Sequence, residues 1–280
     1  MQIERAREMG FCFGVRRAIK LLEQAAQKHG TIESLGAVVH NRQVVNRLAG
    51  LGVKVVDNAD QIKGDVVAVP SHGLGLLQLE KLKSDVTTVV DATCPFVRRA
   101  QVSARKLAQA GFQVVIFGDA EHAEVKAILG SCEGGGIVTT DANITFSEPP
   151  RRLGVLSQTT QSPERFGRFV KDLLDKILSD IDELRVINTI CDATRERQAA
   201  AYELASHSDI MLVVGDLNSA NTHRLAELCA GEGVETHLVE GASQLEAAWF
   251  KNKKHVGITA GASTPDETID LVINKLQNLV

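Results

Sequence analysis

The residues of this sequence that are best suited to chemistry are three of its five cysteines. Cys12 lies in "GFCFGVRRA", Cys94 in "DATCP" and Cys191 in "NTICDAT". They are separated by stretches that are each long enough for a small α/β domain. Three thiols at one centre could hold a zinc ion with a fourth ligand or a water. They could equally hold an iron–sulfur cluster, for which thiolate is the usual ligand.

The residues around Cys12 favour the cluster. Gly10 and Gly14 bracket it, and glycine lets the backbone approach a bulky cluster and donate N–H groups to its sulfides. Phe11 and Phe13 would provide an apolar surface that keeps water away from the cluster. A glycine-bounded hydrophobic turn around a buried cysteine is the structural alternative.

The other two cysteines, Cys132 and Cys229, lie in or beside helical patterns, and we expect them to be structural. A free cysteine is often a small buried hydrophobe. The number of cysteines is odd and no pair has a C-x-x-C spacing, so a disulfide framework is not expected.

Polar side chains follow several of the expected strands and indicate an anion pocket. Hydroxyls, amides and backbone N–H groups at helix starts bind phosphate well. Imidazoles add donors that can carry charge near neutral pH. A lone histidine is more often a surface or core residue, but three at similar strand ends favour a function. The candidate residues are His40, His72, His122, Glu124, Thr159, Ser219, Asn221 and Ser263.

The scaffold expected to position these residues is an α/β fold. Short β-branched runs alternate with amphipathic segments along the whole chain, which is typical of mainly parallel sheets. Ligands of such sheets gather outside the carboxyl ends of the strands, where Cys94 and Cys191 are expected to lie. Strands are predicted in 66–73, 88–95, 114–122, 153–163, 185–194, 210–222 and 255–265, and helices in 41–52 and 163–181.

Composition narrows the class of protein. The net charge of −4 argues against a nucleic-acid binder held by a basic surface. No apolar run reaches the roughly 20 residues that span a bilayer. The start, "MQIERAREMG", is charged and lacks an apolar signal region, so we expect a cytoplasmic protein with no membrane association.

Eight segments in order make the sequence resemble the 4-hydroxy-3-methylbut-2-enyl diphosphate reductases, the last enzymes of the non-mevalonate isoprenoid route. They are "GFCFGV", "HN…VVNRL", "SHG", "DATCP", "SQTT", "NTICDAT", "NSANT…RLAEL" and "AGASTPD". The resemblance implies three small α/β lobes in a pseudo-threefold arrangement around a central iron–sulfur cluster. The implied lobes are 14–93, 94–190 and 191–280, the third joined by the N-terminal segment 1–13.

The same resemblance assigns roles to the candidate residues. Cys12, Cys94 and Cys191 would hold a 4Fe–4S cluster that leaves one iron open to substrate. Glu124 would be the proton donor or relay, and Thr159 would lie with it near the substrate hydroxyl. The residues implied to contact the substrate diphosphate are His40, His72, His122, Ser219, Asn221 and Ser263.

The implied reaction is a reductive dehydroxylation of an allylic diphosphate to isopentenyl and dimethylallyl diphosphate. Electrons would come from a ferredoxin- or flavodoxin-type partner. Three alternatives stay open at this point. A redox or oxygen sensor explains the thiols but not the polar set. A zinc enzyme would be colourless, whereas an iron–sulfur protein is brown. A Rossmann-type nucleotide enzyme lacks its G-x-G-x-x-G segment after the first strand.

Overall fold

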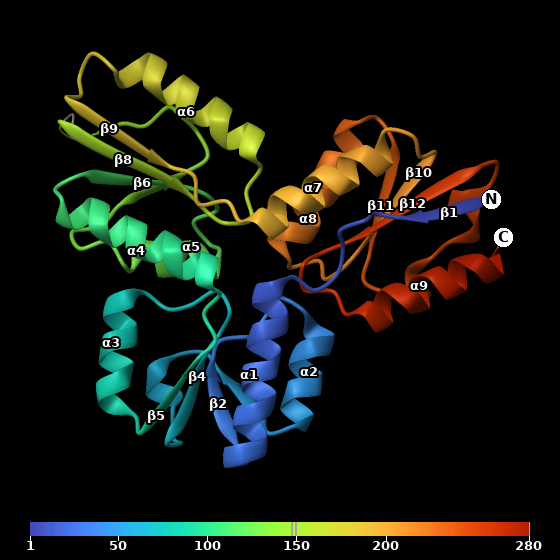
Figure 1. Cartoon of the computed structure of the whole chain (residues 1–280), viewed down its shortest axis with the longest axis horizontal. Helices are drawn as coiled ribbons and strands as arrows, with labels where there is room; N and C mark the ends of the chain where they lie inside the picture. The colour runs from blue at the N-terminus through green and yellow to red at the C-terminus, as the bar shows by residue number, and fades with distance from the viewer. Residues whose placement is uncertain (147, 149, 280) are drawn as a thin grey trace. The chain divides into compact units, whose positions relative to one another are not determined.

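The computed structural model describes residues 1–146, 148 and 150–279, so residues 147, 149 and 280 of the predicted lobes lie outside the described residues. Within the described residues the chain forms three four-stranded sheets, and every strand pair is parallel (Figure 1). The α/β class expected from the alternating sequence pattern is therefore confirmed, with three lobes that each contain one sheet.

The elements follow one another in a repeated order. Sheet B contains β2 (Ile32–Leu35), β3 (Val53–Val56), β4 (Val66–Val69) and β5 (Thr88–Asp91), with α1 (Phe13–His29), α2 (Arg42–Gly50) and α3 (Leu76–Asp85) before or between them. Sheet C contains β6 (Gln113–Phe117), β7 (Ile137–Thr139), β8 (Arg152–Ser157) and β9 (Glu183–Ile187), with α4 (Pro95–Gln109), α5 (Ala123–Leu129) and α6 (Pro163–Ile177). Sheet A contains β1 (Gln2–Arg5), β10 (Ile210–Val214), β11 (Glu235–Val239) and β12 (His255–Ala260), with α7 (Asp192–Ala205), α8 (Ala220–Gly231) and α9 (Asp266–Leu279).

All three sheets have the same strand order. The orders are β5-β4-β2-β3 in sheet B, β9-β8-β6-β7 in sheet C and β1-β12-β10-β11 in sheet A. The N-terminal strand β1 thus takes the edge position that β5 and β9 take in the other sheets. It pairs in parallel with β12, with Gln2 opposite His255. The third lobe is therefore completed by the start of the chain.

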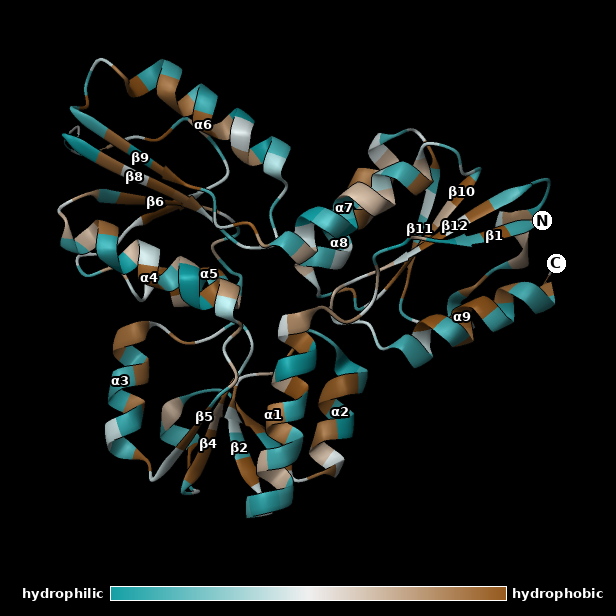
Figure 2. Ribbon diagram, viewed as in Figure 1, coloured by the Kyte–Doolittle hydropathy of each residue, from teal (hydrophilic) through white to brown (hydrophobic). Residues whose placement is uncertain are grey.

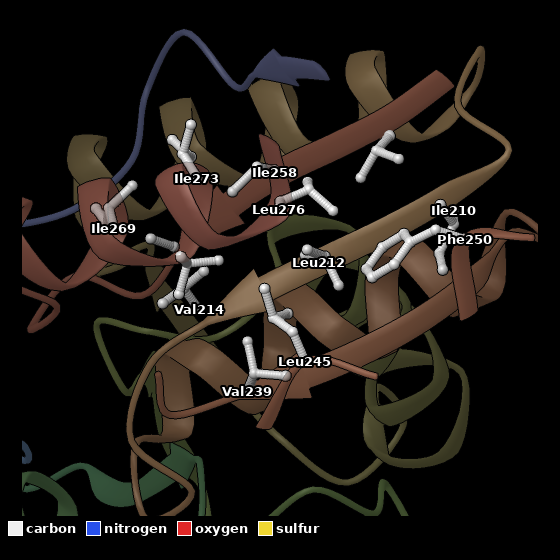
Figure 3. Close-up of a cluster of buried hydrophobic side chains, with 13 residues drawn as sticks. Ile210, Leu212, Val214, Val239, Leu245, Phe250, Ile258, Ile269, Ile273 and Leu276 are labelled. Atoms are coloured by element: carbon white, nitrogen blue, oxygen red, sulfur yellow. The ribbon is translucent and has the colours of Figure 1, made fainter. Parts of the chain in front are cut away.

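The core of sheet A explains why its central strand is continuously apolar. Every residue of β10, sequence IMLVV, is buried, as expected when helices cover both faces of a parallel strand. On one face, Leu212 packs with Ile269 and Leu276 of α9 (Figure 3). On the other face, Met211 packs with Leu225 of α8 and with alanines of α7. The alternation of the two faces fixes the register of the strand.

Helix α6 illustrates how sequence signals set an element. Ser162 caps it by accepting a hydrogen bond from the Arg165 N–H, and Pro163 occupies the first helical position. Phe166 and Phe169 face inward and pack on Phe117 of β6. Its outward face is polar, which gives the alternating teal and brown ribbon of α6 in Figure 2. The helix predicted in 163–181 is confirmed and ends at Ile177.

The chain divides into two compact units. One consists of 1–16, 39–47 and 192–280, and the other of 17–38 and 48–191. The first contains sheet A and the second contains sheets B and C. The finer lobe boundaries expected from the sequence stay a prediction. In the part of the chain that the structure describes, no helix combines the length and apolar character needed to cross a bilayer.

A glycine in β12 permits close packing and gives a stability prediction. A Cβ at Gly257 would lie 2.3 Å from the Met211 sulfur and 2.9 Å from Leu204 Cγ. Gly257→Ala should therefore lower the free energy of unfolding by about 1–3 kcal/mol through overpacking, measured by urea denaturation. Gly231→Ala is the control because a Cβ there meets nothing within 4 Å. Equal stability of both variants would contradict the packing described.

Candidate functional site

The three candidate cysteines occupy one equivalent place in the three sheets. Each follows the edge strand of its sheet, and its backbone N–H donates to the second residue past the end of the neighbouring strand. The pairs are Cys12 with Ala262 at 3.0 Å, Cys94 with Ser71 at 2.9 Å and Cys191 with Thr159 at 3.1 Å. The same hydrogen bond at the carboxyl edge of three sheets makes these cysteines a repeated structural feature. In the sequence, the repetition is visible as the Asp-Ala-Thr segment that adjoins both Cys94 and Cys191.

Each of these cysteines also stands directly before a helix, namely α1, α4 or α7. Helix N-termini present unpaired N–H groups and a positive dipole end, which stabilise thiolate. The N–H of Val15 donates to Cys12 Sγ at 3.5 Å. A backbone N–H thus contacts the Cys12 sulfur, and Cys94 and Cys191 stand at equivalent helix starts.

The remaining cysteines lie in a different environment. Cys132 and Cys229 are buried, whereas Cys12, Cys94 and Cys191 are partly exposed. Burial raises the pKa of Cys132 to about 11 and that of Cys229 to about 12. Both therefore stay protonated near neutral pH, as suits structural cysteines.

The loop that carries Cys94 is held by charged hydrogen bonds. Asp91 accepts from the Thr93 N–H at 3.0 Å and from the Arg98 guanidinium at 2.6 Å. Arg17 donates to the Thr93 carbonyl at 3.1 Å. Asp91 is thus a positioning residue for the segment that ends in Cys94, in keeping with its place in "DATCP".

Glu124 and Thr159 meet across the ends of β6 and β8. The Thr159 N–H donates to Glu124 Oε1 at 2.6 Å, and the Thr159 hydroxyl lies 2.8 Å from Oε2. Glu124 is only 3% exposed, and burial raises its pKa above the ordinary value, although the two hydrogen bonds from Thr159 oppose the shift. The pair therefore combines a carboxyl that tends to keep its proton with a hydroxyl in contact with it.

His122 caps the same helix that carries Glu124. Its Nδ1 accepts the Glu124 N–H at 3.1 Å, so in the neutral ring the proton lies on Nε2. That leaves Nε2 as a hydrogen-bond donor. The arrangement gives the histidine a fixed tautomer and a fixed orientation at the start of α5.

His72 lies one residue past the carbonyl that binds Cys94. Its Nε2 is 3.7 Å from the point where a Cβ of Gly36 would lie, and Gly36 has a φ of +92°, a conformation that favours glycine. His72 lines a cavity of ≈ 490 Å³ together with Gly36, Gly73 and Lys126 among other residues. A Cβ at position 36 would therefore meet the imidazole at ordinary contact distance, and it is the positive φ that favours glycine there.

In the other unit, Ser263 connects two segments that are distant in sequence. Its hydroxyl donates to the His40 carbonyl at 2.9 Å. It follows Ala262, which accepts the Cys12 N–H. Burial lowers the pKa of His40 below its ordinary value, and the negative charge of Asp216 opposes part of the shift. His40 is thus neutral near pH 7 in the absence of a bound anion.

Ser219 and Asn221 form the start of α8. The Ser219 hydroxyl caps the helix by accepting from the Thr222 N–H at 3.4 Å. Asn221 is buried, and its Nδ2 makes no hydrogen bond within the described residues. A buried amide donor without a partner is costly unless a ligand satisfies it, which fits an anion site at this helix start.

The position of these residues in the repeated unit relates them to one another and shows one residue, Asp216, that sequence analysis missed. Asn41 caps α2 by accepting from the Val44 N–H, at the place where His122 caps α5 and Ser219 caps α8. Asp216, also buried, accepts the Arg42 N–H at 2.9 Å beside it. Asn41 was named from the sequence with His40, whereas alignment of the segments that follow β2, β6 and β10 would have revealed Asp216.

The predicted residues fall into two sets, one in each compact unit. One contains Cys94, Cys191, His72, His122, Glu124 and Thr159, and the other contains Cys12, His40, Ser219, Asn221 and Ser263. In the first group, Thr159 contacts both Glu124 and the Cys191 N–H. In the second, Ser263 contacts His40. The gathering of all three thiols at one centre stays a prediction.

Comparison with known proteins gives consistent matches over the whole chain. The family model described as LytB protein matches residues 3–277. A relative from Dehalococcoides mccartyi (strain CBDB1), named 4-hydroxy-3-methylbut-2-enyl diphosphate reductase, is 50% identical and covers 100% of this chain and 99% of the relative. A relative of the same name from Geobacter sulfurreducens is 44% identical and covers 99% of this chain and 97% of the relative.

Solved structures agree. One described as (E)-4-hydroxy-3-methyl-but-2-enyl diphosphate reductase, the terminal enzyme of the non-mevalonate pathway, matches with a TM-score of 0.71 and 38% identity over 99% of this chain and 100% of that chain. The Plasmodium falciparum reductase structure matches with a TM-score of 0.91 over 99% of this chain and 88% of that chain, and at 24% identity it supports the fold alone. Since the family model and the relatives both span nearly the full length, the chain belongs to the LytB protein family.

Proposed function

We propose that this chain is an iron–sulfur reductase that removes the hydroxyl of 4-hydroxy-3-methylbut-2-enyl diphosphate and yields isopentenyl and dimethylallyl diphosphate. The observation that carries the proposal is the recurrence of one cysteine at the same hydrogen-bonded place in three sheets. The names of the full-length relatives supply the substrate.

The donor set suits a 4Fe–4S cluster. Three partly exposed thiols, Cys12, Cys94 and Cys191, stand at helix N-termini that favour thiolate. They would be the three protein ligands. When bound, the cluster supplies electrons one at a time and an iron that acts as a Lewis acid toward the substrate oxygen.

Glu124 would supply the proton that lets the substrate oxygen leave as water. Thr159 donates to both oxygens of Glu124, from its N–H to Oε1 and from its hydroxyl to Oε2 at 2.8 Å. When Glu124 is protonated, the fixed N–H keeps Oε1 as an acceptor, so the acid proton would lie on Oε2 and the Thr159 hydroxyl would rotate. Thr159 then accepts this hydrogen bond and has its own proton to donate toward the substrate. The burial that raises the pKa of Glu124 favours the acid form that general acid catalysis needs.

The diphosphate would bind to neutral donors and helix starts. In one unit these are the Asn221 amide, the neutral imidazole of His40 and the hydroxyls of Ser219 and Ser263. In the other, the proposed donors are His72 and the Nε2–H of His122. A diphosphate held in this way needs many hydrogen bonds, each to a charged group and each contributing roughly 1.5–3 kcal/mol.

Removal of one such donor should weaken substrate binding. Asn221→Ala and His40→Ala are each expected to raise the substrate Kd about tenfold or more, since 1.4 kcal/mol corresponds to one decade. Isothermal titration of the anaerobic, cluster-loaded protein measures this. His29→Ala, a change at an exposed histidine at the end of α1, is the control and should leave the Kd unchanged. Unaltered affinity in both test variants would remove this group from the pocket.

A metal and colour analysis separates the proposal from a zinc enzyme. Protein purified without air should be brown and contain iron and acid-labile sulfide in a 4:4 ratio, as expected for such a cluster. Addition of the diphosphate substrate should change the visible spectrum. Colourless protein containing only zinc would refute the proposal.

The remaining parts of the proposal concern the setting of the reaction. The electrons would come from a small ferredoxin- or flavodoxin-type protein, since two one-electron transfers are needed. A reducing compartment such as the cytoplasm would keep the thiols available for the cluster.

A further inference from the structure

A second group of metal-ligating side chains lies in sheet A, away from the cysteine edge. Glu4 belongs to β1, His255 begins β12, and His207 lies in the turn between α7 and β10. His207 and His255 thus stand at the amino ends of β10 and β12, whereas Cys12 binds the loop past the carboxyl end of β12. The group is therefore separate from the residues of the proposed reaction.

The ligand atoms of the three residues converge. Glu4 Oε2 lies 3.0 Å from His255 Nε2 and 3.6 Å from His207 Nε2. All three atoms lie within 4.8 Å of one another, and the two imidazoles stack with their centroids 5.2 Å apart. A tetrahedral ion with ligands at 2.0–2.1 Å places ligand atoms about 3.3 Å apart, so the two contacts to Glu4 bracket the required spacing.

The hydrogen bond of His255 determines what its other nitrogen presents to Glu4. Nδ1 lies 2.9 Å from the His207 carbonyl, and a carbonyl only accepts, so Nδ1 carries the proton. Nε2 is therefore the ring nitrogen that is left to bind a ligand. This Nε2 is buried and makes no hydrogen bond in the described residues, although it lies within ion-pair distance of the Glu4 carboxylate. Glu4 Oε2 and His255 Nε2 thus face the same point, where one cation would contact both.

The hydrogen bond from His255 Nδ1 to the His207 carbonyl is of the kind that metal-bound histidines usually make with the nitrogen that does not bind the metal. Such histidines donate their second N–H to a carboxylate or a backbone carbonyl, which fixes the tautomer and orients the ring. His255 has this contact already, and its side chain is 14% exposed. Glu4 and His207 are 42% and 49% exposed, so both can rotate to close the coordination sphere.

Local packing explains why His207 reaches the sheet. Glu4 is paired with Gly257, and Gly257 lets the end of α7 approach until Leu204 and Ser208 nearly touch the strand. The Ser208 hydroxyl donates to the Leu204 carbonyl at 2.8 Å and holds the turn that carries His207. Among the described residues, no lysine or arginine pairs with Glu4.

We propose that Glu4, His207 and His255 bind one zinc ion, with water as the fourth ligand. Two imidazoles and one carboxylate are a common three-residue ligand set for zinc. The ion would join β1 to β12 and to the α7–β10 turn. It would thereby fasten the N-terminal strand, an edge strand held by one neighbour, to the sheet that it completes.

Zinc titration of the cluster-loaded protein tests the proposal. With the cluster in place and oxygen absent, calorimetry and metal analysis should show one added zinc per chain and no loss of iron. Glu4→Gln, His207→Ala and His255→Ala should each weaken zinc binding at least tenfold, in line with the loss of a ligand. Zinc should raise the melting temperature of the wild type and not of these variants.

His237→Ala is the matched control, because His237 also pairs with a glutamate, Glu235 at 2.9 Å, but belongs to no three-ligand group among residues 1–146, 148 and 150–279. It should bind zinc as the wild type does. Glu4→Gln preserves the shape of an exposed side chain and keeps the test valid if a histidine variant fails to fold. Absence of zinc binding by the wild type, or equal binding by Glu4→Gln, would overturn the site.

Discussion

Cys94→Ser is expected to abolish turnover and to remove most of the bound iron. A serine hydroxyl is a poor iron ligand, and a cluster held by only three cysteines has no spare one. Cys94 stands at the N-terminus of α4 on a loop held by the Asp91–Arg98 hydrogen bond, so serine at this position would keep the loop and lose only the thiol. Cys12→Ser and Cys191→Ser should behave alike, because the three positions are equivalent. Iron and sulfide content and the visible spectrum of anaerobically prepared protein measure the loss.

Cys132→Ser is the matched control for the cysteine series. Cys132 is buried, and its thiol donates to the Ile128 carbonyl at 3.6 Å, a contact that serine can also make. This variant should keep its iron and nearly all of its activity. Loss of the cluster from Cys132→Ser as severe as that from Cys94→Ser would contradict the ligand assignment.

Glu124→Gln is expected to lower turnover about 10²-fold or more while iron content and substrate binding stay intact. Glutamine keeps the size of the side chain, and its oxygen can still accept the Thr159 N–H, but it has no proton to release. Thr159→Val should give a smaller loss, since it removes the hydroxyl at Oε2 and leaves the carboxyl. Single-turnover kinetics with prereduced protein measure the chemical step separately from electron delivery.

The pH profile distinguishes proton supply from a structural role of Glu124. Burial raises its folded pKa, so the acid form is present below that pKa and is lost as pH rises through it. Turnover of the wild type should fall on this alkaline limb, and Glu124→Gln should lack it. Near-normal turnover of Glu124→Gln, or an unchanged alkaline limb, would assign the proton to water or to the substrate diphosphate.

Sequence patterns were sufficient for the repeated units of the fold. Buried parallel strands are continuously apolar, so "IMLVV" and similar runs could be placed to within a few residues. The cysteines could be placed at strand ends for the same reason. Strand β1 could not be predicted, because "QIER" is short and polar and its partner, β12, lies at the other end of the chain. Its pairing depends on tertiary contacts alone.

The sequence was sufficient to predict which residues belong to the candidate site, but not which of them contact one another. Glu124 and Thr159 each follow a strand, but their hydrogen bonds depend on β6 and β8 being neighbours in sheet C. The unpartnered amide of Asn221 likewise emerges only from packing around α8. The upward shift of the Glu124 pKa depends on the burial of its side chain, which no local sequence pattern specifies.

Conversion of the diphosphate substrate by cluster-loaded protein tests the central claim most directly. Wild-type protein reconstituted with iron and sulfide without air is mixed with 4-hydroxy-3-methylbut-2-enyl diphosphate and a chemical reductant, and the products are identified by NMR. Isopentenyl and dimethylallyl diphosphate should form, in amounts that rise with cluster content and vanish in Cys94→Ser. Unchanged substrate in the presence of an intact, reduced 4Fe–4S cluster would contradict the proposed function.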